Sequence, residues 1–103
     1  MKREFVNLTP HKIMLNDGTV FEPSGIVARV EAKFTDVVDG FCRQQFGKIE
    51  NLPDPKADTI YIVSAMVFSA TDRVDVVAPA TGHPETVRNE KGHIVSVPCL
   101  IRK

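Results

Sequence analysis

The chain has 103 residues, 13 basic and 13 acidic side chains, a formal net charge of zero and 43% hydrophobic residues. This length and composition predict one globular domain over residues 1–103. Long nucleic acids are excluded as partners, because binding them requires an excess of lysine and arginine to displace counterions. Zero net charge leaves binding of a small anion open.

Neither a targeting segment nor a membrane span is expected. The first five residues carry positive charge, but no apolar stretch follows them as in a signal peptide. No apolar run approaches the roughly 20 residues that cross a bilayer. Cys42 and Cys99 are too few and too far apart for a disulfide framework, so we expect both to be small core or half-buried residues. We therefore expect a protein of the cytoplasm with no membrane partner.

Three turn signals predict three antiparallel hairpins. They are Asn16-Asp17-Gly18, Asp39-Gly40 and Asn89-Glu90-Lys91-Gly92, and each separates two short segments rich in apolar residues. Asp-Gly pairs and a late glycine supply the positive φ angles that tight hairpins need. The predicted fold is mostly β (α+β): a small antiparallel sheet or partly open barrel built from three hairpins.

The segments between the turns differ in their patterns. Residues 28–35 alternate between apolar and polar, which predicts a strand with Ala28, Val30, Ala32 and Phe34 facing the core. Residues 60–63 form a continuous apolar run, typical of a strand buried on both faces. A short helix over about residues 65–71 should follow, with Ser64 as its N-cap. In the last strand, residues 95, 97, 99 and 101 should share one face, and Pro98 predicts an edge position or a bulge.

No catalytic or metal-binding pattern is present. The histidines at positions 11, 83 and 93 lie in separate elements without the spacing of a zinc site. Ser64 follows a strand and opens a helix, but it lacks the flanking glycines of a nucleophile elbow. Aspartates near turns are expected to make local hydrogen bonds. We expect a binding protein without enzymatic activity, cofactor or metal.

Two segments could contribute to an anion site. The amide groups after Ser64, at the start of the helix, could bind a phosphate together with Arg73 or Arg88; the alternative is that both arginines are surface charges. The stretch Asn7-Leu8-Thr9-Pro10-His11 concentrates donors and acceptors on a backbone that Pro10 restrains. It could form a rigid polar edge facing a ligand, or a turn whose side chains bond to nearby backbone.

These residues also carry a resemblance to a known family. The opening Asn-Leu-Thr-Pro-His motif resembles that of a widespread group of small, largely uncharacterised phage and prophage proteins. The likeness continues through Pro23-Ser24-Gly25, Tyr61–Ser64, Arg73–Pro79 and Val87–Ile94, although family members commonly carry Asp where this chain has Asn89. The resemblance implies a viral origin and an accessory role. The polar groups that recur in the family pattern fall on Asn7, Thr9, His11, Ser64, Arg73, Asp75 and Arg88.

Three functions follow as hypotheses. The first is an anti-defence protein that sequesters a nucleotide-derived immune signal in the cytoplasm of the bacterial host. Arginine would bind the phosphates, Tyr61 or a phenylalanine would stack on a base, and homo-oligomerisation through an exposed sheet edge would enlarge the site. The alternative is a protein-binding inhibitor of a host defence factor, or a small virion component, without a small-molecule ligand. An enzyme that degrades the same signals ranks last.

Overall fold

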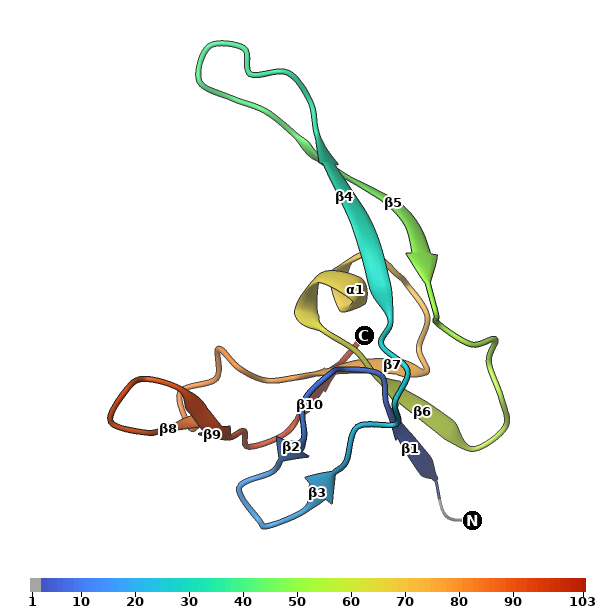
Figure 1. The fold of residues 1–103 in the computed structure, drawn as a ribbon, viewed down its shortest axis with the longest axis vertical. Coiled ribbons are helices and arrows are strands. Elements are labelled where there is room, and N and C mark those ends of the chain that lie inside the picture. Colours follow the sequence, from blue (N-terminus) through green and yellow to red (C-terminus); the bar gives the residue numbers. More distant parts are fainter. Residues whose placement is uncertain (1–2) are drawn as a thin grey trace.

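A central four-stranded sheet organises the molecule (Figure 1). The computed structural model describes residues 3–103. The strand order is β1-β6-β7-β10, in which the first three strands are parallel and the last is antiparallel to its neighbour. The bounds are Glu4–Asn7 for β1, Thr59–Ile62 for β6, Val76–Pro79 for β7 and Leu100–Arg102 for β10.

The apolar run at residues 60–63 explains why β6 is an inner strand. Ile62 and Val63 have no exposed surface, and Tyr61 is almost fully buried. Helix α1 (Ala65–Ser69) follows and connects β6 to its parallel neighbour β7. Ser64 caps the helix as the sequence predicts, because its side chain accepts a hydrogen bond from the amide of Val67 at 3.3 Å.

All three predicted hairpins form, and they account for the remaining strands. The turn at Asp39 and Gly40 has φ angles of 54° and 83°, the left-handed pair that suits a tight hairpin. The hairpins pair β2 (Ile13–Met14) with β3 (Val20–Phe21), β4 (Arg29–Phe34) with β5 (Gln44–Glu50), and β8 (Val87–Arg88) with β9 (Ile94–Ser96). The mostly β fold with one short helix is therefore confirmed, with parallel pairs in the central sheet that turn signals do not predict.

The core lies in two clusters. Side chains of consecutive β6 residues point to opposite faces of the sheet. One cluster contains Leu8, Ala28, Tyr61, Val63, Val67 and Val76. The other contains Ile13, Ile62, Val77 and Val97.

The hairpin of β4 and β5, residues 29–50, projects from the body as an arm (Figure 1). The radius of gyration is 15.3 Å, larger than the roughly 13 Å of a compact chain of this length. Phe34 is 66% exposed, so the expectation that it faces the core is wrong, because the arm extends past the body that would cover it.

Other expectations about burial are also corrected. Cys42 and Cys99 are both exposed, since one lies in the arm and the other in the break between β9 and β10. That break also contains Pro98, where the sequence predicts a bulge or edge. Val97 is buried, but Val95 and Ile101 are 49% and 45% exposed, so the last strand does not present one buried face. No helix within residues 3–103 is long and apolar enough to cross a membrane.

Candidate functional site

A groove lies beyond the carboxyl ends of the three parallel strands. Thr9, Ser64 and Thr81 come shortly after β1, β6 and β7, and parallel strands bring their carboxyl ends to the same edge of a sheet. Ligands of open sheets with parallel strands commonly bind at this edge. The groove, called the carboxyl-end groove below, has a volume of about 510 Å³. It is lined by Thr9, Pro10, His11, Ile13, Met14, Ser64, Ala65, Pro79, Thr81 and residues 94–97.

Asn7 holds the polar turn that forms one wall. It is 2% exposed, and its amide nitrogen donates to the carbonyl groups of His11 at 2.8 Å and Phe21 at 3.0 Å. Its Oδ1 accepts from the Thr9 amide at 2.9 Å and from the Thr9 hydroxyl at 2.7 Å. The side chains thus bond to nearby backbone, and Asn7 lies behind the groove instead of lining it. Its effect is to fix Thr9 and His11 in place.

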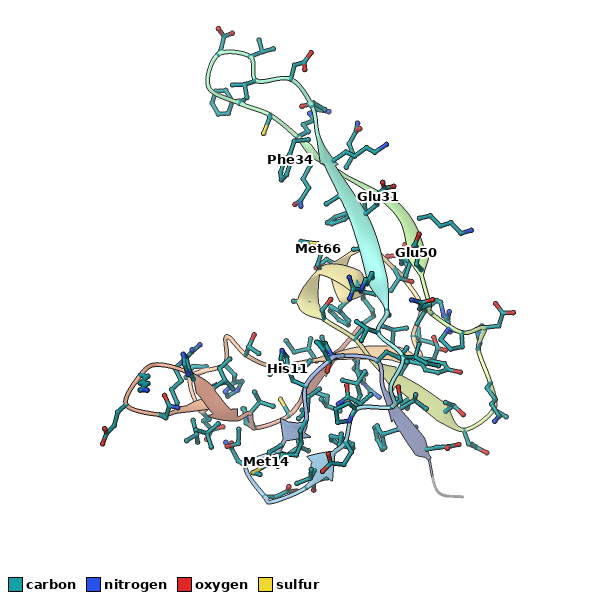
Figure 2. The ribbon with its side chains drawn as sticks, in the orientation of Figure 1. His11, Met14, Glu31, Phe34, Glu50 and Met66 are labelled. Carbon is teal, nitrogen blue, oxygen red and sulfur yellow. The ribbon has the colours of Figure 1, made fainter. Side chains whose placement is uncertain are left out.

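The exposed polar residues that line the groove are therefore His11, Ser64 and Thr81. Figure 2 shows His11 on the segment between β1 and β2, and Met14 at the end of β2. The Ser64 hydroxyl accepts one hydrogen bond from Val67 and donates none to the residues that the structure describes. Helix α1 has five residues, so we expect the side chains to contribute more to anion binding than the helix terminus does.

Arg88 does not line the groove, but it bonds to the lining residue Thr81, and this position is called the rim below. One guanidinium nitrogen donates to the carbonyl of Gly92 at 3.0 Å, and another donates to the carbonyl of Thr81 at 3.3 Å. These bonds hold Arg88 across the β8–β9 hairpin beside a lining residue. A guanidinium has five N–H groups, so others remain for an anion. Within the described residues 3–103, no Asp or Glu lines the groove.

Arg73 and Asp75 lie at the opposite edge of the sheet, where β7 begins. The Arg73 guanidinium donates to both Asp75 carboxylate oxygens, at 3.0 and 2.6 Å, and to the carbonyl of Pro53 at 2.8 Å. The hydrogen bond from Arg73 lowers the pKa of Asp75, and the same bond raises the pKa of Arg73. The pair therefore fastens the loop at Pro53 to the sheet, away from the groove.

Tyr61 does not line the groove either. Its ring lies beneath Arg73, with the guanidinium carbon 5.8 Å from the ring centroid, and its hydroxyl donates to the carbonyl of Asp54 at 3.3 Å. With 4% of its surface exposed, Tyr61 cannot stack on a base. The expectation of a stacking role does not fit this position.

The structure thus brings together Thr9, His11 and Ser64, with Arg88 at the rim, and separates them from Arg73 and Asp75. Sequence reasoning missed the apolar walls, of which Ile94 and Val95 are 42% and 49% exposed. Two adjacent exposed apolar residues in one short strand are a signal that strict alternation would not produce. Arg29 shares a smaller hollow of about 360 Å³ with Ser64.

Among residues 3–103, no group of three or more His, Cys, Asp or Glu side chains is arranged to hold a metal ion. No family model, curated protein or solved structure matches this chain.

Proposed function

We propose that this protein binds and sequesters a nucleotide-derived anion in the carboxyl-end groove. The observation that carries the proposal is the combination of apolar walls with the polar side chains of Thr9, His11 and Ser64, a guanidinium at the rim, and no lining carboxylate in the described part of the chain. Ligand sites are typically concave and mostly apolar, with a few polar groups that orient the ligand.

Each part of such a ligand has a counterpart in the groove. A volume of about 510 Å³ lies within the range of roughly 300–1,000 Å³ for small-molecule sites. The base would contact the apolar walls, including Met14 and Val95. A phosphate would accept hydrogen bonds from Ser64, His11 and the remaining N–H groups of Arg88, because arginine matches phosphate geometry. No lining carboxylate among residues 3–103 repels that charge.

The resemblance to phage and prophage proteins gives this binding a biological setting. The protein would act in the cytoplasm of the bacterial host and hold an immune signal away from its effector. A second candidate is a protein-binding inhibitor or small virion component. It is favoured by the arm, where Val37, Val38 and Phe41 are 73%, 64% and 78% exposed.

Purified protein mixed with cyclic dinucleotides and ADP-ribose-type compounds provides the test. A ligand at 100 times its Kd adds about 2.7 kcal/mol to the free energy of unfolding, which raises Tm by roughly 10–20 °C for a domain of this size. Since the chain has one tyrosine and no tryptophan, a co-purified nucleotide would also dominate its ultraviolet spectrum.

His11→Ala should reduce nucleotide affinity without changing the Tm of the free protein, because this side chain is exposed and makes no hydrogen bond within residues 3–103. His93→Ala is the matched control, since His93 is also exposed but lies outside the groove. Ligand recovered intact after denaturation supports sequestration, and cleaved ligand would indicate an enzyme. The proposal fails if no nucleotide shifts Tm, or if His11→Ala binds like the wild type.

A further inference from the structure

The arm has an unpaired strand edge. Within the described residues, β4 pairs with β5 along one edge only, and no other strand joins this two-stranded ribbon. A two-stranded ribbon by itself is marginally stable, and exposed edges present unpaired N–H and C=O groups to other chains. Beyond α1 the ribbon also leaves Phe34 and Phe46 exposed, at 66% and 41%.

The hydrogen-bonding pattern of the ribbon shows which β4 residues direct their backbone N–H and C=O groups toward the open edge. The amide of Thr35 donates across the ribbon to the carbonyl of Arg43 at 2.9 Å. Backbone groups in an antiparallel ladder alternate between the two sides of a strand, so Lys33 also directs its groups toward β5. The N–H and C=O groups of Ala32 and Phe34 therefore point to the open edge.

We propose that two copies of this chain associate through their β4 edges, antiparallel around a two-fold axis at Ala32. Ala32 then lies opposite the partner's Ala32, and Val30 lies opposite the partner's Phe34. Glu31 lies opposite the partner's Lys33, so two cross-strand ion pairs of opposite charge form around the axis. The result is a four-stranded antiparallel sheet with the order β5-β4-β4-β5.

Charge and the length of β4 together select this register among the symmetric ones. A two-fold axis that falls between residues would bring outward-facing backbone groups opposite inward-facing ones, so the axis must pass through a residue. An axis at Glu31 would place it opposite the partner's Glu31, and an axis at Lys33 would place it opposite the partner's Lys33. Like charges directly opposite each other are unfavourable. Axes at Val30 and Phe34 also avoid them, but within β4 they would pair only residues 29–31 or Phe34 alone, whereas the axis at Ala32 pairs residues 30–34.

The same arrangement covers the exposed apolar residues. Val30, Ala32 and Phe34 share the face of β4 that packs toward α1 near the body. Opposite the partner's Val30, Phe34 reaches the vicinity of the partner's α1, where the partner's Met66 is exposed. In Figure 2, Phe34 lies on the arm beyond α1, while Met66 lies on α1 itself; the latter is 47% exposed. The contact forms twice, as a two-fold interface requires.

Two opposite charge reversals test this pairing. In Glu31→Lys, the new lysine lies opposite the partner's Lys33 on both sides of the axis. In Lys33→Glu, the new glutamate lies opposite the partner's Glu31 in the same way. Each variant alone should weaken self-association by about tenfold or more at low salt. A mixture of the two variants should associate, because each chain then offers charges opposite to those of the other. Lys56→Glu, in the loop before β6, is the matched control and should associate like the wild type.

A third variant removes the backbone contact. Ala32→Pro deletes an N–H that faces the open edge and not β5, so the ribbon should persist while dimerisation is lost. Sedimentation equilibrium distinguishes the monomer of 11.4 kDa from a species of twice that mass, and circular dichroism checks folding. A wild type that stays monomeric up to its solubility limit would refute the proposal. So would a dimer that all three arm variants leave unchanged. Neither outcome bears on nucleotide binding, which involves different residues.

Discussion

Replacing Arg73 by methionine should destabilise the fold without acting on the groove. The guanidinium makes three hydrogen bonds, two to Asp75 and one to the carbonyl of Pro53. Methionine keeps an apolar stem over Tyr61 but leaves the carboxylate without its partner. The side chains of Arg73 and Asp75 are 26% and 17% exposed, so the pair lies between an exposed ion pair, worth up to about 1 kcal/mol, and a buried one, whose disruption costs about 3–5 kcal/mol.

We therefore expect Arg73→Met to lower the free energy of unfolding by about 2 kcal/mol, equivalent to roughly 8–16 °C in Tm. The effect should depend on pH. Asp75 has a lowered pKa in the folded protein, so its contribution to stability is present above the ordinary carboxyl pKa of 3.8 and is lost as pH falls through the lower pKa of the folded state. The wild type and the variant should accordingly converge in stability below about pH 4.

Urea denaturation of the wild type, Arg73→Met, Asp75→Asn and the double variant measures this directly. The coupling energy of the cycle isolates the interaction between the two side chains. A loss below about 0.5 kcal/mol in Arg73→Met, the size expected at an ordinary surface position, would refute the reasoning. So would a loss of ligand affinity at unchanged stability, since it would place Arg73 in the site.

Two further substitutions address the turns. Asn7→Ala should lower the free energy of unfolding, measured by urea denaturation, by about 3 kcal/mol, because it leaves the buried Thr9 amide and two carbonyl groups without their hydrogen-bond partner. A loss below about 1 kcal/mol would show that water replaces the Asn7 side-chain amide. Gly40→Ala should lower the free energy of unfolding by about 1–2 kcal/mol, because φ is 83° at this position. Gly82→Ala is the control and should leave Tm unchanged, since Gly82 lies in open space without a positive φ. Equal effects of the two substitutions would contradict the conformational argument.

The sequence predicts the local features of this fold well. Asp39-Gly40 and Gly92 specify hairpins because tight turns need positive φ, and that requirement acts within a few residues. The cap at Ser64 is equally local. The parallel pairing of β1 with β6 joins segments more than 50 residues apart, and no turn residue encodes it. Phe34 shows a related limit, since alternation indicates which face is apolar but not whether anything covers it.

The candidate site shows the same contrast between local features, which the sequence predicts, and long-range strand pairing, which it does not. Thr9, His11 and Ser64 could be proposed from residue type, and they come together because β1 and β6 are parallel neighbours. Arg73 has the same chemistry as Arg88, yet it belongs to the opposite edge of the sheet. The direction of β7 separates the two arginines. Arg73 precedes this strand, whereas Thr81, to which Arg88 bonds, follows it.

The two proposed activities, nucleotide binding in the groove and self-association at the open edge of β4, involve different parts of the chain. No residue of β4 lines the groove, and no groove residue belongs to the arm. The groove depends on the short turns that follow β1, β6 and β7, which the central sheet and the buried Asn7 hold rigid. The β4 edge instead depends on a ribbon whose base, at Val30 and Ile49, packs on the body. A second copy of the chain would cover the open β4 edge and the exposed apolar residues of the arm, which the body leaves uncovered. It would also leave the polar groups of the groove free for a ligand.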